Sequence, residues 1–196
     1  MRLLVILALL IGSTFSTPLV AGPKPVISIS ADGFPAGHDT PEGAAADLAR
    51  AFINKDVQAF EDVCLRPYGV GGARKEYEQF LQETASTMRE EKARKPPSPE
   101  GPKAIGKVFA ARHLSANGPA SFGYAAHSFQ EVMFVDVDVC LHNGTRQLSR
   151  RLTIKDRDGK WYAHPTPSVS PVLSMGLNDE SPSTKDFSEA YVVKRK

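Results

Sequence analysis

The spacing of apolar residues changes along the chain from a helical repeat to an alternating one. In the first half, apolar positions recur every three to four residues, as they do in helices that bury one face. We predict a helix that begins at Thr40, a shorter helix capped by Asp56, and a third helix from about Arg74 to Lys92. In the second half the repeat becomes two, which is typical of strands with one buried face.

This alternating half predicts an antiparallel meander. The expected strands cover residues 105–114, 129–142, 145–155 and 160–164. Asn143-Gly144 is the strongest hairpin signal in the chain and is typical of a two-residue turn. The predicted fold class is therefore α+β, with three N-terminal helices packed on an antiparallel β-meander.

A two-residue turn would also fix the register of the long hairpin. It pairs Val137 with Arg150. The other pairs on the same face are apolar on both strands: Val139 with Leu148, Val135 with Leu152 and Met133 with Ile154. The next turn is expected to place Trp161 opposite Ile154. A slip of one residue would set the valines against polar residues, and the burial of the apolar face argues against it.

Arg150 interrupts this predicted apolar face. A buried charge is costly unless it is paired, so one hypothesis is that Arg150 anchors a carboxylate or another anion inside a pocket. The alternative is that Arg150 extends to the rim or pairs with a helix carboxylate such as Glu61. The expected ligand-binding residues are Arg150, Val137, Leu152, Trp161, Phe52 and Tyr77.

The opposite face of the same hairpin carries chemically reactive side chains in a row: Asp136, Asp138, Cys140 and His142. Neighbours on one face are about 6.6 Å apart, so four in a line cannot converge on one ion. Metal ligation, a Cys–His nucleophile and an Asp–Asp acid/base pair are alternatives to a solvated face with cross-strand pairs, such as Asp136 with Arg151. We predict the solvated face, with no metal, no cofactor and no catalytic residue.

The first residues of the chain predict export. Met1-Arg2 precedes an apolar run over residues 3–11 and then small residues, which is the pattern of a secretory signal peptide over residues 1–21. The run is shorter than the roughly 20 residues that a membrane span needs. We therefore expect a secreted or periplasmic protein with a linker over residues 22–39, a domain over residues 40–165 and a loosely ordered tail over residues 166–196.

Charge and cysteine content narrow the classes of partner and compartment. The chain has 24 basic and 22 acidic residues, and this balance does not favour a nucleic-acid partner. In an oxidising compartment its two cysteines, Cys64 and Cys140, are expected to form one disulfide, the alternative being two buried thiols.

Helix, short helix, longer helix and a meander ending in Asp158-Gly159-Lys160-Trp161-Tyr162 resemble the nuclear-transport-factor-like superfamily. The opening helix adds to the resemblance, with Pro41-Glu42 leading to Leu48, Phe52, Asn54-Lys55-Asp56 and Phe60. The resemblance implies a cone-shaped fold, in which a curved sheet wraps around helices and leaves a pocket at its wide end. The superfamily has no shared catalytic motif to transfer to this chain.

Three functions remain open from the sequence. The first is an exported, non-catalytic module that binds a small apolar or anionic ligand, or a protein, through the pocket. The second is a small-molecule isomerase or dehydratase, whose base would be Tyr77, His113, Tyr124 or His127. The third is a structural accessory of the cell envelope that uses the segment after residue 166 as a tether. We also consider a homodimer.

Overall fold

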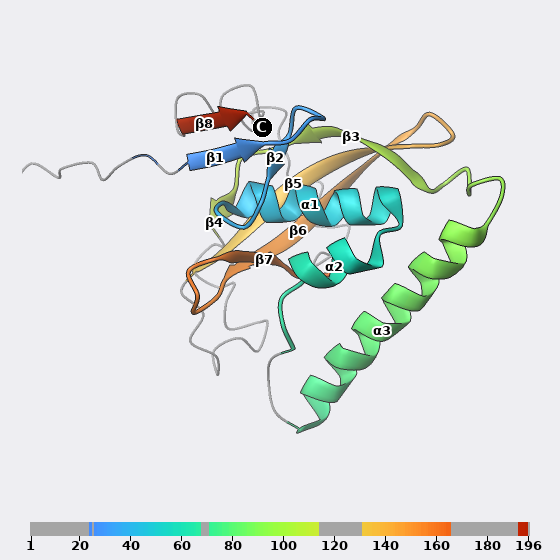
Figure 1. The fold of residues 1–196 in the computed structure, drawn as a ribbon, viewed down its shortest axis with the longest axis horizontal. Helices are drawn as coiled ribbons and strands as arrows, with labels where there is room; N and C mark the ends of the chain where they lie inside the picture. The colour runs from blue at the N-terminus through green and yellow to red at the C-terminus, as the bar shows by residue number, and fades with distance from the viewer. Residues whose placement is uncertain (1–23, 25, 68–70, 114–130, 166–191, 196) are drawn as a thin grey trace, which may run out of the picture.

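The computed structural model describes residues 24, 26–67, 71–113, 131–165 and 192–195 (Figure 1). Three helices precede most of the strands: α1 (Pro41–Asn54), α2 (Val57–Val63) and α3 (Gly71–Ala93). The main sheet is formed by β3 (Pro102–Val108), β4 (Arg112–His113), β5 (Glu131–Leu141), β6 (Arg146–Lys155) and β7 (Trp161–Ala163). A smaller sheet contains β1 (Val26–Ile29), β2 (Pro35–Ala36) and β8 (Val192–Arg195).

The first two helices begin where the sequence predicts. The Thr40 side chain accepts a hydrogen bond from the Gly43 N–H at 3.1 Å, and Asp56 accepts one from the Ala59 N–H at the same distance. These side chains satisfy N–H groups that have no partner inside the helix. Between the helices, Lys55 adopts a left-handed conformation (φ 52°) that ends α1 and turns the chain into α2.

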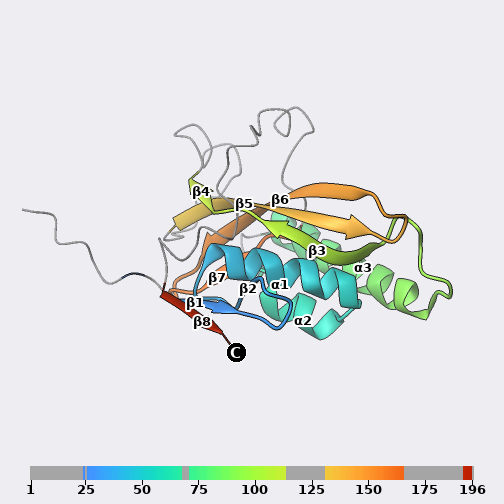
Figure 2. The ribbon, with the colours of Figure 1, turned by 90° about the horizontal axis from the view of Figure 1, so that it is seen from above.

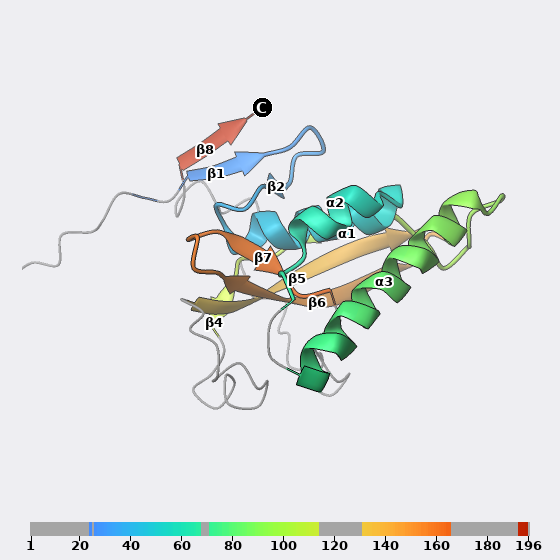
Figure 3. The same cartoon turned by 60° about the horizontal axis from the view of Figure 1, so that its bottom comes forward.

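The main sheet is an antiparallel meander with helices on one side. Its strand order is β3-β5-β6-β7, and β4 pairs with β5. Figure 2 shows α1 and α2 lying along one face of the sheet, and Figure 3 shows α3 running obliquely past the same helices. The predicted α+β fold, with three N-terminal helices on a curved antiparallel β-meander, is confirmed.

The register of both hairpins differs from the prediction by one residue. Each turn is a three-residue loop that ends in a glycine with positive φ, Gly144 at 83° and Gly159 at 77°. The Leu141 N–H accordingly donates to the Thr145 carbonyl at 2.8 Å, which leaves residues 142–144 in the loop. Loops of this kind combine a type I turn with a bulge at the glycine, and an Asn-Gly pair suits them as well as it suits the two-residue turn.

The slip exchanges the two faces of β6, so the predicted pairings were wrong. Val137 pairs with Ser149 and Val135 with Arg151, while Trp161 lies opposite Lys155. Val135, Val137 and Val139 of β5 do face α1, where they pack on Ala45, Ala46 and Ala49. The apolar residues of β6 face the other way, and there Leu152 and Ile154 form a second cluster with Leu65, Tyr162, Val132 and Phe134. Burial therefore did not discriminate between the registers, because both faces of this hairpin bury apolar side chains.

The segments predicted as linker and tail contribute to the small sheet. Val26–Ile29, within the predicted linker, forms β1, and β1 pairs in parallel with Val192–Arg195. Residues 192–195, which belong to the segment predicted as a tail, thus form a strand. Parallel pairing joins segments that are far apart in sequence, so local alternation could not reveal it.

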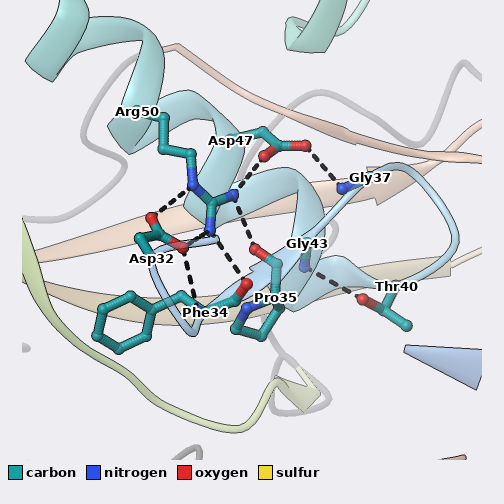
Figure 4. Close-up of polar contacts among 8 residues, drawn as sticks. All are labelled: Asp32, Phe34, Pro35, Gly37, Thr40, Gly43, Asp47 and Arg50. Carbon is teal, nitrogen blue, oxygen red and sulfur yellow. Dashed lines mark hydrogen bonds and ion pairs between the residues drawn. The ribbon is translucent and has the colours of Figure 1, made fainter. Parts of the chain in front are cut away.

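A clamp around Arg50 fastens the strap that joins β1 to α1, residues 30–40 (Figure 4). Arg50 donates to both carboxylate oxygens of Asp32 (2.7 Å each), to Asp47 (2.5 Å), and to the carbonyls of Phe34 and Pro35. Burial raises the pKa of Asp32, but the hydrogen bonds from Arg50 and Phe34 outweigh it and leave that pKa below its usual value. The strap runs so close to α1 that a Cβ at Gly43 would lie 2.3 Å from the Gly37 carbonyl oxygen.

Some sequence-based predictions lie outside the described residues. They are the signal peptide, the side chains of Tyr124 and His127, and the tail between residues 166 and 191. Within the described ranges, no helix combines the length and the apolar character that crossing a membrane requires.

Candidate ligand-binding cavity

A cavity of about 650 Å³ lies between α1, α3 and the helix-facing side of β5 and β6. Ligand pockets commonly have volumes of roughly 300–1,000 Å³. The helices contribute Ala49, Phe52, Lys55, Phe80, Thr84 and Glu91, and the strands contribute Asp136, Val137, Val139, Leu141, Gln147, Leu148, Ser149, Arg150 and Arg151. Pro102 and Pro165 complete the described lining.

The two strands give the cavity walls of different character. Alternation along β5 directs Val137, Val139 and Leu141 toward the helices and makes one wall apolar. On the neighbouring strand β6 the same face carries Gln147, Ser149 and Arg151, so the adjacent wall is polar. Exposure also falls along β6, from the exposed Gln147 to the half-buried Ser149 and Arg151. The polar wall thus ends in a charge that is partly withdrawn from solvent.

Arg151 is a cation without an acidic partner among the described residues. Its guanidinium lies 5.6 Å from the centre of the Phe52 ring, and its Nε is enclosed and donates no hydrogen bond. One Nη reaches the Pro165 carbonyl only at 3.5 Å. Burial lowers the pKa of Arg151 to about 10, with the neighbouring Cys64 acting in the opposite direction. The group therefore remains charged at neutral pH.

At the hairpin end of the cavity, Lys55 and Glu91 form an ion pair. The Lys55 ammonium lies 2.5 Å from a Glu91 carboxylate oxygen and joins the end of α1 to the last turns of α3. The same two residues border a small adjoining hollow near Pro97, Ser98 and His142. Because each charge is matched by the other, this end of the cavity carries no net charge.

Arg150, the predicted anchor, is engaged on the opposite side of the sheet. Its Nε donates to Asp136 at 2.7 Å, and its guanidinium lies 5.8 Å from the Phe134 ring. Arg112 of β4 also donates to Asp136, whose side chain is only 1% exposed. Cross-strand ion pairs on this face were predicted, but Asp136 pairs with Arg150 and not with Arg151.

The structure brings together half of the predicted ligand-binding set. Phe52 and Val137 line the cavity, and Arg150 borders it with its guanidinium held by Asp136. Leu152 lies in the cluster on the other face of the sheet, and Trp161 packs in the core with Ala44 and Leu48. Tyr77 donates a hydrogen bond to the Leu65 carbonyl and lies against His164.

Sequence reasoning missed Arg151, Phe80 and Thr84. Phe80 and Thr84 lie on the apolar stripe that the helical repeat of the third helix produces, and this stripe indicates an inward face without indicating a cavity. Arg151 was placed on the solvated face by the same one-residue error that placed Arg150 inside. If the loop is taken as residues 142–144, the alternation along the strand predicts that Arg151 faces the helices.

The two cysteines are free thiols, so the expected Cys64–Cys140 disulfide does not form here. Cys64 lies in the core cluster on the helix side, whereas Cys140 lies on the other face of β5, beside Gly106 and Arg146. The sheet itself separates them. In the described ranges, no group of three or more His, Cys, Asp or Glu side chains is placed to hold a metal ion.

Three helices on one face of a curved antiparallel sheet, with a cavity between the helices and the sheet, give the chain a cone-like α+β architecture. No protein-family model matches the sequence, and no curated protein matches it. One solved structure, a Campylobacter jejuni protein described as an NTF2-like transpeptidase, aligns with 15% identity and a TM-score of 0.39. The alignment covers 64% of this chain and 97% of that one.

Proposed function

We propose that the protein is an exported, non-catalytic module that holds a small ligand in the cavity between α1, α3 and the sheet. The observation that carries this proposal is the cavity itself, with about 650 Å³ of space and an apolar wall formed by β5. The apolar side chains that line a space of this size lack packing contacts on that side, and a ligand would supply them.

The state of the carboxylates in the described lining supports binding over proton transfer. Asp136 is held by Arg112 and Arg150, and Glu91 is paired with Lys55. A general base must be able to reach and accept a substrate proton, and carboxylates engaged in this way are poorly suited to it. The hypothesis of an isomerase or dehydratase therefore has less support than the hypothesis of a ligand-binding module.

A pair of cavity-filling variants tests the proposal. Thr84→Trp places a large ring into the cavity from α3, and Thr87→Trp places the same ring on the exposed face one turn later. We expect an uncharged fluorescent probe such as Nile red to bind the wild-type protein and the Thr87→Trp variant. Thr84→Trp should weaken that binding about tenfold or more. Equal binding by all three proteins would contradict a ligand site in this cavity.

Export is a separate part of the proposal and rests on the N-terminal sequence pattern. Protein purified from its natural host is expected to lack residues 1–16 or 1–21, which intact-mass measurement would reveal. A mature protein that retains Met1-Arg2 and the apolar run would contradict export by this route.

A further inference from the structure

The ionisable groups of the described lining leave one positive charge unmatched. Lys55 is matched by Glu91, and Arg150 is bonded to Asp136. Arg151 has no carboxylate among the described residues, and its enclosed Nε donates to no acceptor. An enclosed donor without a partner is costly and unusual in folded proteins. The cavity therefore has a specific deficit, which is one anionic acceptor at Arg151.

The groups around Arg151 show where that acceptor would lie. The guanidinium rests beside the Phe52 ring, which leaves its edge for in-plane hydrogen bonds. A carboxylate suits this guanidinium because its two oxygens can accept from the two Nη groups in parallel. A doubly charged phosphate would keep a second charge without a described cation beside it, at high cost in a partly enclosed site. The geometry therefore favours a group with a single negative charge.

The rest of the cavity suits an apolar body attached to that group. From Arg151 to Gln147 the strand covers ~13 Å at the usual rise per residue. Beside this stretch, on the same face of the neighbouring strand, lie Val137 and Val139, and exposure increases toward Gln147. A ligand with one charged end and a narrow apolar body would place its charge at Arg151 and its body on the β5 wall.

We propose that the cavity binds small amphipathic monocarboxylates, with the carboxylate on Arg151 and the apolar body along the valine face of β5. This inference rests on the proposed function and adds the chemical class of the ligand. It assigns Arg151 as the recognition residue, in place of Arg150.

Calorimetric titration with decanoate and decan-1-ol separates the anion from the apolar body. An extended decanoate has a length similar to the distance from Arg151 to Gln147, and decanol lacks only the charged group. We expect the wild-type protein to bind decanoate at least tenfold more tightly than decanol. Arg151→Gln should remove this preference and leave decanol binding within twofold of wild type. Arg146→Gln is the matched control, since Arg146 lies on the outer face with Asp138, and it should retain the preference.

The outcomes distinguish the two proposals. Equal affinity for both probes in the wild type, abolished by Thr84→Trp, would overturn the carboxylate inference and leave the ligand-binding function standing. Binding of neither probe would overturn the carboxylate inference, and failure to bind Nile red as well would overturn the ligand-binding function. Retention of the decanoate preference in Arg151→Gln would overturn the assignment of Arg151.

A second measurement does not depend on a folded Arg151 variant. The carboxyl carbon of ¹³C-labelled decanoate reports its own ionisation by NMR during a pH titration of the wild-type complex. Contact with the guanidinium should lower the pKa of the bound carboxyl below that of the free acid. A bound carboxyl that titrates at or above the free value would overturn the inference.

Discussion

The clamp around Arg50 and the cavity around Arg151 use the same type of residue in opposite ways. All the donors of Arg50 have acceptors, which are two carboxylates and two carbonyls that hold the strap on α1 (Figure 4). Arg151 is comparably withdrawn from solvent, but its Nε has no acceptor and its one carbonyl contact is long. A fully bonded arginine stabilises the fold, whereas one without a partner keeps its bonding capacity for a ligand.

This comparison predicts that Arg50→Ala has the largest effect on stability. Its removal leaves Asp32 and Asp47 close together and frees the strap, so we expect a loss of about 3 kcal/mol in the free energy of unfolding. Urea denaturation measures this loss. Arg74→Ala, which breaks an exposed pair with Glu78, is the control and should cost less than about 1 kcal/mol.

The contribution of the clamp should also depend on pH in a defined direction. Because the folded state lowers the pKa of Asp32, the stabilisation is complete above the usual value of 3.8 and is lost as the pH falls through the lower folded-state value. The difference between wild type and Arg50→Ala should therefore shrink in that acidic range. A difference that grew there would contradict the role given to Asp32.

Arg150→Ala should have the next largest effect, and on stability alone. It deprives the buried Asp136 of one of two cations, and Arg112 remains, so the expected loss is about 2 kcal/mol. Decanoate affinity should stay within about threefold of wild type, since the Arg150 guanidinium is already bonded to Asp136. A selective loss of decanoate binding in a stable variant would restore Arg150 as the anchor.

Arg151→Met should increase the stability of the ligand-free protein, in contrast to Arg50→Ala and Arg150→Ala. It replaces an enclosed, unpaired cation by an apolar side chain of similar length, so the unfolding free energy should rise by about 1–2 kcal/mol. Urea denaturation beside Arg74→Met gives the comparison at an exposed site. A loss as large as that of Arg50→Ala would mean that Arg151 also has a structural partner, and the contrast between the two regions would fail.

The smallest expected effect concerns the reactivity of Cys64. Burial raises the pKa of its thiol, and the nearby Arg151 partly offsets this. Alkylation of the folded protein should modify Cys64 at least about tenfold more slowly than Cys140, and Arg151→Met should slow Cys64 further by about two- to fivefold. Peptide mapping by mass spectrometry measures both rates. Equal rates, or an intact mass lower by two hydrogens, would contradict the free and unequally buried thiols.

The helices could be predicted from the sequence because their signals are local. Thr40 and Asp56 cap the helices that they precede, and one apolar stripe runs along each helix. The strand register could not be predicted, because Asn143-Gly144 is compatible with two loop lengths. Either register also places apolar residues of β6 on a buried face. The strand at residues 192–195 depends on a partner far away in sequence. The sequence therefore predicted a cavity with an arginine in its lining, but it indicated Arg150 in place of its neighbour Arg151.

The three-residue loop at residues 142–144 has a consequence for redesign. Shifting the register of a strand by one residue exchanges the two faces on which its side chains lie. Deleting His142 would leave the shorter, two-residue turn that Asn143-Gly144 also permits. The strand would then present Leu148, Arg150 and Leu152 to the helices and send Arg151 outward. The length of this loop therefore decides which of two consecutive guanidinium groups lies on the helix-facing side of the sheet, and inserting or deleting one residue would exchange them.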